Sequence, residues 1–293
     1  MAVTSAPATT ARVTRQGPIG KFIRKQPGGA VAALFVIGIL LVAAFAPWIA
    51  PRDPLRTDFL AQLTPPSWEH PLGTDTFGRD ILSRIIIGAR TAIMIGFGAA
   101  FMGSTVGALW GAVSAYFGGR VDLIMQRFVD IIISFPIIIV ALAVVAMIGP
   151  GVLNVMIALT IPIIPKVARV VRSSALVIRE TQYVEGARAV GAGHLRVVLK
   201  HMAPNLAAPY LIMLTAMLGQ AILLEASLSF LGLGVAEPTP AWGLMLRGAA
   251  VDYAQTAPWM AIFPGLAITL TVLAFNIFGD SLRDVLDPKM QGS

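Results

Sequence analysis

The chain has 293 residues, 56% of them hydrophobic and only 13% charged, and its mean hydropathy is +0.78. Soluble domains carry about 25% charged residues, so this composition argues against a soluble domain and predicts a membrane protein. The net charge of +7 gathers beside apolar segments without interleaved aromatic residues, which argues against nucleic-acid binding.

The first uncharged stretch, Ala30–Ala50, is long enough to cross the membrane once, since about 20 apolar residues span the hydrocarbon layer. A cleaved secretory signal is the alternative. A 29-residue flank before the stretch, and Pro47 directly after the cleavage-like Ala44-Phe45-Ala46, favour a retained anchor. Residues 1–29 are expected in the cytoplasm because they hold five basic side chains and no acidic one: Arg12, Arg15, Lys21, Arg24 and Lys25.

Residues 51–86 are predicted to form a compact extracytoplasmic loop, because several prolines oppose a long helix there. From Asp80 to Arg90 the apolar spacing is helical and predicts a short helix along the membrane interface. His70 is interpreted as a capping or surface residue, and no metal site is expected, because the chain has no cysteine and no second histidine nearby.

Charges in this loop alternate in sign at Asp75, Arg79, Asp80 and Arg84. Local salt bridges are the plain interpretation of the pattern. Contact with another protein is the functional interpretation.

Residues 87–280 are predicted to form the transmembrane core, followed by a cytoplasmic tail over 281–293. The 35 uncharged residues from Ile131 to Pro165 would make a helix of about 52 Å, too long for one crossing. Gly149-Pro150-Gly151 divides them into an antiparallel pair, and Arg120–Asp130 is interpreted as a connection between spans. The core spans are expected at about 91–116, 131–149, 152–171, 205–233 and 256–279.

The charge distribution predicts the orientation of the spans. Residues 166–201 carry seven Lys or Arg side chains against two acidic ones and are expected in the cytoplasm. Six crossings then place both termini there. The chain is therefore predicted to be an all-α integral membrane protein with six transmembrane helices.

Two features inside the predicted spans have alternative interpretations. Gly103, Gly107 and Gly111 form a stripe on one helical face, which is typical of close helix contact with another span or a partner permease, although glycine is also common in membrane helices. Glu225, with Ser229 close by, is the one clear ionisable exception within the spans. It is a carboxylate near the outer interface, or one hydrogen-bonded to a neighbouring helix, or a polar contact that lines the passage.

A polar, basic island, Tyr183–Asn205, lies between two long apolar segments. Helix propensity is good over Glu180–Val190, Gly191 and Gly193 allow a turn with positive φ, and His194–Met202 is expected to form a second helix that Pro204 ends. The exposed face should present Arg188, Arg196 and Lys200, and a partner is expected to bury Val184, Ala187 and Val190. An ordinary basic loop that anchors the topology is the alternative.

Four segments carry a resemblance to a known family. Glu185-Gly186-Ala187 followed by Gly191, and Pro204-Asn205, resemble the EAA motif of binding-protein-dependent ABC importer permeases, with Gly186 in place of the usual middle alanine. His70–Asp75 with Gly78-Arg79-Asp80, residues 228–243, and residues 276–288 resemble the C-type permeases for dipeptides and oligopeptides. The signature residues of the loop are Gly73, Thr74, Asp75, Gly78, Arg79 and Asp80.

The resemblance implies the type I ABC importer permease fold and a set of partners. It implies a second, homologous permease, two ATPase subunits that hold ATP and Mg, an extracytoplasmic solute-binding protein and a location in the cell (inner) membrane. It also implies that the coupling residues are Tyr183, Glu185, Gly186, Ala187, Arg188, Gly191, Pro204 and Asn205.

The chain is expected to be a non-catalytic subunit that binds no cofactor and no nucleic acid. It has no Gly-x-x-x-x-Gly-Lys-Ser/Thr phosphate loop and no Gly-x-Ser-x-Gly elbow. The expected solute is a dipeptide, an oligopeptide or a related small molecule. A secondary carrier or a channel that works without an ATPase is the alternative.

Overall fold

The computed structural model describes residues 26–286, with the side chains of residues 250, 251 and 286 excepted, and this part of the chain contains helices and no strand. The basic residues before Gln26 and the motif residues Asp287-Pro288 lie outside it. The helices are α2 (Pro27–Ile49), η1 (Phe59–Ala61), α3 (Ile81–Phe117), α4 (Gly119–Ile133), α5 (Ile137–Ile148), α6 (Val152–Arg179), α7 (Gln182–Ala189), α8 (His194–Arg196), the π-helical η2 (Val197–Met202), α9 (Ala203–Phe230), α10 (Trp242–Asp252) and α11 (Trp259–Leu286).

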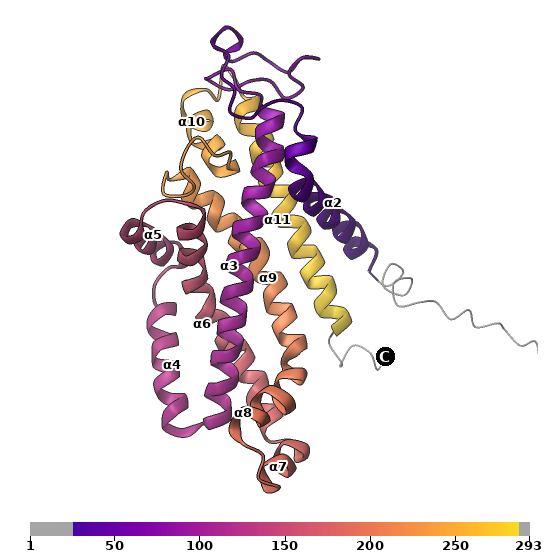
Figure 1. The fold of residues 1–293 in the computed structure, drawn as a ribbon, viewed down its shortest axis with the longest axis vertical. Helices are drawn as coiled ribbons and strands as arrows, with labels where there is room; N and C mark the ends of the chain where they lie inside the picture. The colour runs from indigo at the N-terminus through magenta and orange to yellow at the C-terminus, as the bar shows by residue number, and fades with distance from the viewer. Residues whose placement is uncertain (1–25, 287–293) are drawn as a thin grey trace, which may run out of the picture.

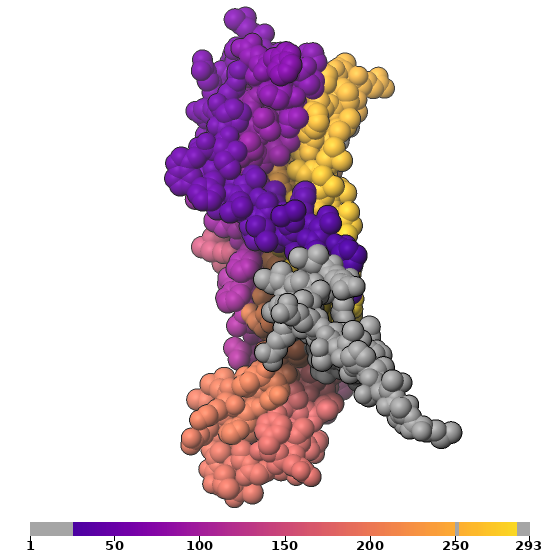
Figure 2. Space-filling model, turned by 90° about the vertical axis from the view of Figure 1, so that its right-hand side faces the viewer, coloured from indigo at the N-terminus to yellow at the C-terminus, as the bar shows by residue number. Residues whose placement is uncertain are grey.

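Helix α3 is the centre of an elongated bundle (Figure 1). α6 and α9 pack on α3, α11 packs on α9, and α2 lies along α3 and α11. The residue 51–80 loop lies at one end of the bundle with α10, and α7 and α8 lie at the other. We call these the loop end and the α7 end. Figure 2 shows the α7 end as an exposed lobe.

Five helices are long and apolar enough to cross a membrane: α2, α3, α6, α9 with its preceding turns, and α11. α4 and α5 together make a sixth candidate, bent by 88°. Arg120–Asp130, predicted to connect two spans, is helical and belongs to α4. α4 and α5 are separated by a break at Ser134–Pro136. Proline disfavours a helical conformation in the residue before it and has no amide hydrogen, so Pro136 interrupts the helix.

The predicted interface helix over Asp80–Arg90 is not a separate element. Asp80 caps α3, its side chain accepting a hydrogen bond from the amide of Ser83 at 2.9 Å, and the helix runs without a break to Phe117. Its 37 residues span about 55 Å, so α3 is longer than the hydrocarbon layer is thick.

The glycine stripe of α3 faces α6 of the same chain. A Cβ atom added to Gly103 would lie 2.6 Å from Cγ2 of Ile163. One added to Gly107 would lie 2.6 Å from the carbonyl oxygen of Ile164, and one on Gly111 2.4 Å from that of Ala168. Real Cβ contacts are not this short, so the two backbones can approach this closely only because the stripe has no side chains.

Candidate functional site

The α7 end carries a short helix, a tight turn and a second short helix. α7 ends where Gly191 takes a φ of +80°, which favours glycine, and the amide of Ala192 donates to the carbonyl of Ala187 at 3.1 Å. Gly193, expected to share the positive φ, instead has a φ of −62° at the start of α8.

Pro204 does not end the second helix as predicted. The six residues Val197–Met202 form a π-helical stretch, and α9 continues directly from it with Pro204 in its first turn. Proline is tolerated in a first turn, and the wider π-helical turn accommodates the change in hydrogen bonding there. His194–Phe230 thus forms one continuous helical rod of 37 residues.

The two ends of the island are joined by side chains. The amide nitrogen Nδ2 of Asn205 donates to the hydroxyl of Tyr183 at 2.9 Å, and also to the carbonyl of His201 at 3.1 Å. These bonds fix α7 against the first turn of α9.

Arg188, Arg196 and Lys200 are exposed as predicted, whereas two of the three residues expected to contact a partner are not. Val184 is fully buried and Ala187 is 9% exposed within the chain itself, because α7 packs on η2. Val190 alone of the three predicted contacts is open, at 84% exposure. The side chains exposed around it include Glu185, Arg188, Leu195, Arg196 and Lys200, beside a groove of about 340 Å³ lined by residues of α7, the Gly191 turn and η2.

Tyr116, near the end of α3, is a contact that the sequence analysis missed. Its hydroxyl lies 2.7 Å from Nδ1 of His194, and Cζ of Arg188 lies 4.6 Å from the centre of its ring. Arg179 adds a second link, donating from Nη1 to the carbonyl of Ala115 at 2.9 Å. Tyr116 is separated by 78 positions from His194, so local sequence spacing gives no signal for the pair.

Charged residues of α4 and α6 form two pairs. Nε of Arg172 donates to Asp122 at 2.6 Å, and Nη2 of Arg169 donates to Asp130 at 2.7 Å. These pairs hold α4 against α6. The acidic side chains of α4 meet basic ones that lie about 40 to 50 positions later.

Glu225 is bonded within its own helix and not to a neighbouring one among the described residues. It is fully buried, and its Oε1 accepts from Ser229, one turn along the same helix, at 2.7 Å. Its Oε2 has no hydrogen-bond partner among the described residues. Glu225 is also not the one charged exception within the predicted spans, because Lys166 of α6 reaches Gln220 of α9 at 3.3 Å.

At the loop end, the family-signature residues form one hydrogen-bonded turn. Oδ1 of Asp75 accepts from the amides of Phe77 and Arg79, and its Oδ2 accepts from Nε of Arg79 at 2.6 Å. Nε of Arg84 lies 3.8 Å from the same Oδ2. The predicted local salt bridges are therefore present around Asp75.

The two signature glycines are required by the backbone of this turn. Gly73 and Gly78 have φ values of +77° and +70°. A Cβ atom on Gly78 would lie 1.8 Å from the carbonyl oxygen of Asp58. Thr74, fully buried between the two glycines, accepts a bond from Nε1 of Trp259 on its carbonyl at 3.2 Å.

His70 is not a surface residue as expected. It is 8% exposed, and its Nδ1 lies 3.0 Å from Oδ1 of Asp80 while its Nε2 lies 3.3 Å from Nη1 of Arg52. The reason is that Asp80 uses its other oxygen to cap α3, and the buried carboxylate needs a second partner. No group of three or more potential metal ligands occurs among the described residues.

Comparison with known proteins identifies the family. Residues 103–292 match the family described as binding-protein-dependent transport system inner membrane component, and residues 21–66 match the N-terminal TM domain of oligopeptide transport permease C. The chain belongs to this family of permeases. It is a multi-pass inner membrane protein and a permease subunit of an ATP-driven importer.

Curated relatives align with nearly the whole chain. The glutathione transport system permease protein GsiD of Escherichia coli O157:H7 is 44% identical over 270 residues, covering 92% of this chain and 89% of the relative. A Brucella suis biovar 1 protein, provisionally named a peptide transport system permease protein, is 42% identical over 261 residues, covering 89% and 88%. This permease differs from them at more than half of the aligned positions.

A solved structure shows the same fold. A chain of the MetNI methionine ABC transporter, in an inward-facing conformation, superposes with a TM-score of 0.58 at 19% identity, covering 71% of this chain and 98% of that one. The permease fold inferred from the sequence is therefore confirmed for the core of the bundle.

Proposed function

We propose that this permease pairs with a second, homologous permease to form the pathway of an importer for peptides or related small solutes. Two ATPase subunits would supply the energy and hold ATP and Mg, and an extracytoplasmic binding protein would deliver the solute. The names of the two relatives support this solute class, because they concern glutathione and peptides.

In this proposal the α7 end lies in the cytoplasm and the loop end lies outside. The basic residues of segment 166–201 support that orientation. Residues 1–29 and 281–293 would lie on the same side as α7, and the charged turn around Asp75 would lie on the side from which the solute arrives.

The observation that carries the proposal is the combination of an exposed α7 face with rigid links behind it. Glu185, Gly186, Arg188 and Gly191 are exposed and available to a partner. Behind them, Val184 is buried, Tyr116 joins the element to α3, and Asn205 joins it to α9. A displacement of α7 by an ATPase would therefore move α3 and α9 with it, and α6 packs on both.

A bulky residue at the exposed face tests this coupling. Glu185 makes no side-chain hydrogen bond or ion pair with another described residue, so Glu185→Trp should leave the fold intact and obstruct docking. In proteoliposomes holding the complete importer and its binding protein, we expect the amount of alanyl-alanine or glutathione taken up per ATP hydrolysed to fall.

The matched control is Glu69→Trp, which replaces an exposed glutamate at the loop end. It should leave the uptake per ATP unchanged. Normal coupling in Glu185→Trp, or solute movement by the permeases without any ATPase, would contradict the proposal and support the carrier or channel alternative.

A further inference from the structure

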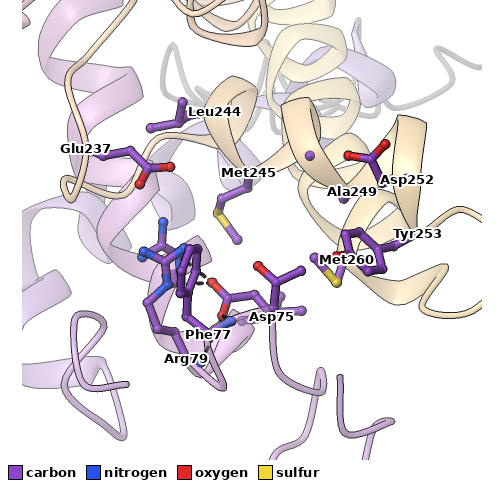
Figure 3. A pocket seen from close by; sticks show the side chains of 14 residues that line it. Asp75, Phe77, Arg79, Glu237, Leu244, Met245, Ala249, Asp252, Tyr253 and Met260 are labelled. Atoms are coloured by element: carbon purple, nitrogen blue, oxygen red, sulfur yellow. Dashed lines mark hydrogen bonds and ion pairs between the residues drawn. The ribbon is translucent and has the colours of Figure 1, made fainter. Parts of the chain in front are cut away.

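A cavity of about 240 Å³ lies at the loop end, between the turn that follows Asp75, helix α10 and the start of α11 (Figure 3). Pockets for drug-sized ligands are usually larger, at about 300–1,000 Å³, so this volume suits a smaller molecule. The cavity is lined by charged and apolar side chains that come from segments far apart in the sequence.

One wall of the cavity carries two buried arginines, Arg79 and Arg84, close to the carboxylate of Asp75. Arg79 is 9% exposed and Arg84 is 2% exposed, and both guanidinium groups share the single carboxylate of Asp75. Arg84 also donates to the carbonyl of Pro54 at 3.2 Å, and Arg79 lies over the ring of Phe77. A guanidinium has five N–H donors, so several donors of this pair have no partner among the described residues.

Carboxylates face this wall from α10 and the segment before it. In Figure 3 Glu237 lies on the guanidinium side of the cavity and Asp252 lies with Tyr253 on the opposite side. Neither carboxylate makes an ion pair within 4.0 Å with another described residue. Both side chains are exposed, which leaves the two carboxylates accessible to a cation.

The remaining lining is apolar and adaptable. Leu244, Met245 and Met260 border the space between the charged walls. Methionine side chains are flexible and fill irregular gaps, so they accommodate side chains of different shapes. The cavity thus has charged groups at two sides, and between them an apolar lining that can accommodate ligand side chains of different shapes.

We propose that this cavity binds a small zwitterion, such as a short peptide, with its carboxylate on Arg79 and Arg84 and its ammonium group on Asp252. The proposal rests on the proposed function and specifies its solute class at a site on the outer face of this permease. Charge-assisted hydrogen bonds at both ends of the ligand would recognise free termini, and the side chains between them would be weakly selected.

The test uses the complete importer in lipid nanodiscs without its binding protein. Saturation-transfer NMR is recorded with alanyl-alanine, with its N-acetyl form and with its C-terminal amide. We expect transfer to alanyl-alanine, and an affinity lower by about tenfold or more for each blocked form, because each lacks one charge-assisted contact.

Three variants locate the binding. Asp252→Asn should lower the affinity for alanyl-alanine by about tenfold. The variant should also bind alanyl-alanine and its N-acetyl form equally well. Gly248→Phe should abolish the transfer, because a Cβ atom at this cavity-lining glycine has no neighbour within 4 Å and the new ring can occupy the space. Asp53→Asn, the same change at an exposed loop residue outside the cavity, should have no effect.

Equal transfer in the unaltered importer and in Gly248→Phe, or no transfer at all, would overturn the proposal. Equal binding of the free and blocked dipeptides would also overturn it. ATP-driven uptake by the same protein variants is measured separately, in sealed proteoliposomes that hold the complete importer together with its binding protein. An importer that transports without binding at this cavity then refutes the site alone. Absence of uptake of any peptide refutes the proposed solute class instead.

Discussion

The hydroxyl of Tyr116 lies 2.7 Å from Nδ1 of His194, which joins the last turn of α3 to the first residue of α8. The same tyrosine ring is covered by the guanidinium of Arg188 on α7 itself. One side chain of a membrane-crossing helix thus holds both short helices of the island. The rigidity of the proposed coupling element depends on this contact.

Removal of the Tyr116 hydroxyl should weaken coupling without unfolding the protein. Tyr116→Phe loses one hydrogen bond, worth about 1 kcal/mol, and we expect about a fivefold loss in uptake per ATP hydrolysed. The matched control is Tyr210→Phe, which removes a hydroxyl that lies 3.0 Å from Thr105 between α9 and α3, away from the island. Equal losses in the two variants would show that Tyr116 acts only on stability.

The glycine stripe predicts a steric effect on the contact between α3 and α6. Gly111→Ala places a Cβ atom 2.4 Å from the carbonyl oxygen of Ala168 and should destabilise the fold by about 1–3 kcal/mol. Gly38→Ala in α2 meets nothing within 4 Å and should not destabilise it. Thermal unfolding in detergent compares the two, and an unchanged midpoint for Gly111→Ala would contradict the close contact.

Gly186 and Gly191 should respond in opposite directions to alanine. A Cβ atom on Gly186 meets nothing within 4 Å, so Gly186→Ala should stabilise α7 by up to ~1 kcal/mol through helix propensity. Gly191→Ala should cost about 1–2 kcal/mol because its φ is +80°. Hydrogen exchange of the α7 amides should slow in the first variant and accelerate in the second, and a shift of the same sign in both would argue against this turn.

The two charged pairs between α4 and α6 should differ in strength. Arg172 and Asp122 are 28% and 16% exposed, whereas Arg169 and Asp130 are both about half exposed. Arg172→Ala should therefore cost about 1.5–3 kcal/mol and Arg169→Ala below about 1 kcal/mol. Thermal unfolding midpoints of the two variants provide the measurement. A larger loss of stability for Arg169→Ala would contradict the relative strengths of the two pairs.

The apolar spans were predictable from the sequence because each is a run of consecutive apolar residues. Ala30–Ala50 and the break at Gly149-Pro150-Gly151 both correspond to features of the structure. The helical state of Arg120–Asp130 was not predictable in this way. Its acidic residues are satisfied by Arg172 and Arg169, and such pairs depend on how two distant helices pack.

The candidate sites show the same limit. The motif gave the exposed residues of α7 and the glycine turn, since both depend on local backbone conformation. The burial of Val184 by η2 and the contact of Tyr116 with His194 depend on tertiary packing. His70 was misassigned for the same reason, because its partners Arg52 and Asp80 approach it only in the folded loop.

The most direct test of the central claim asks whether an ATPase covers the α7 face. The chain has no native cysteine, so single cysteines can be introduced at Val190, 84% exposed at the α7 end, and at Leu60, fully exposed at the loop end. Labelling by a membrane-impermeant maleimide is measured on sealed inside-out vesicles, with and without the ATPase subunits. We expect Val190→Cys to be labelled only when the ATPase subunits are absent and Leu60→Cys to remain unlabelled in both. Labelling of Leu60→Cys, or equal labelling of Val190→Cys with the ATPase subunits bound, would contradict the account.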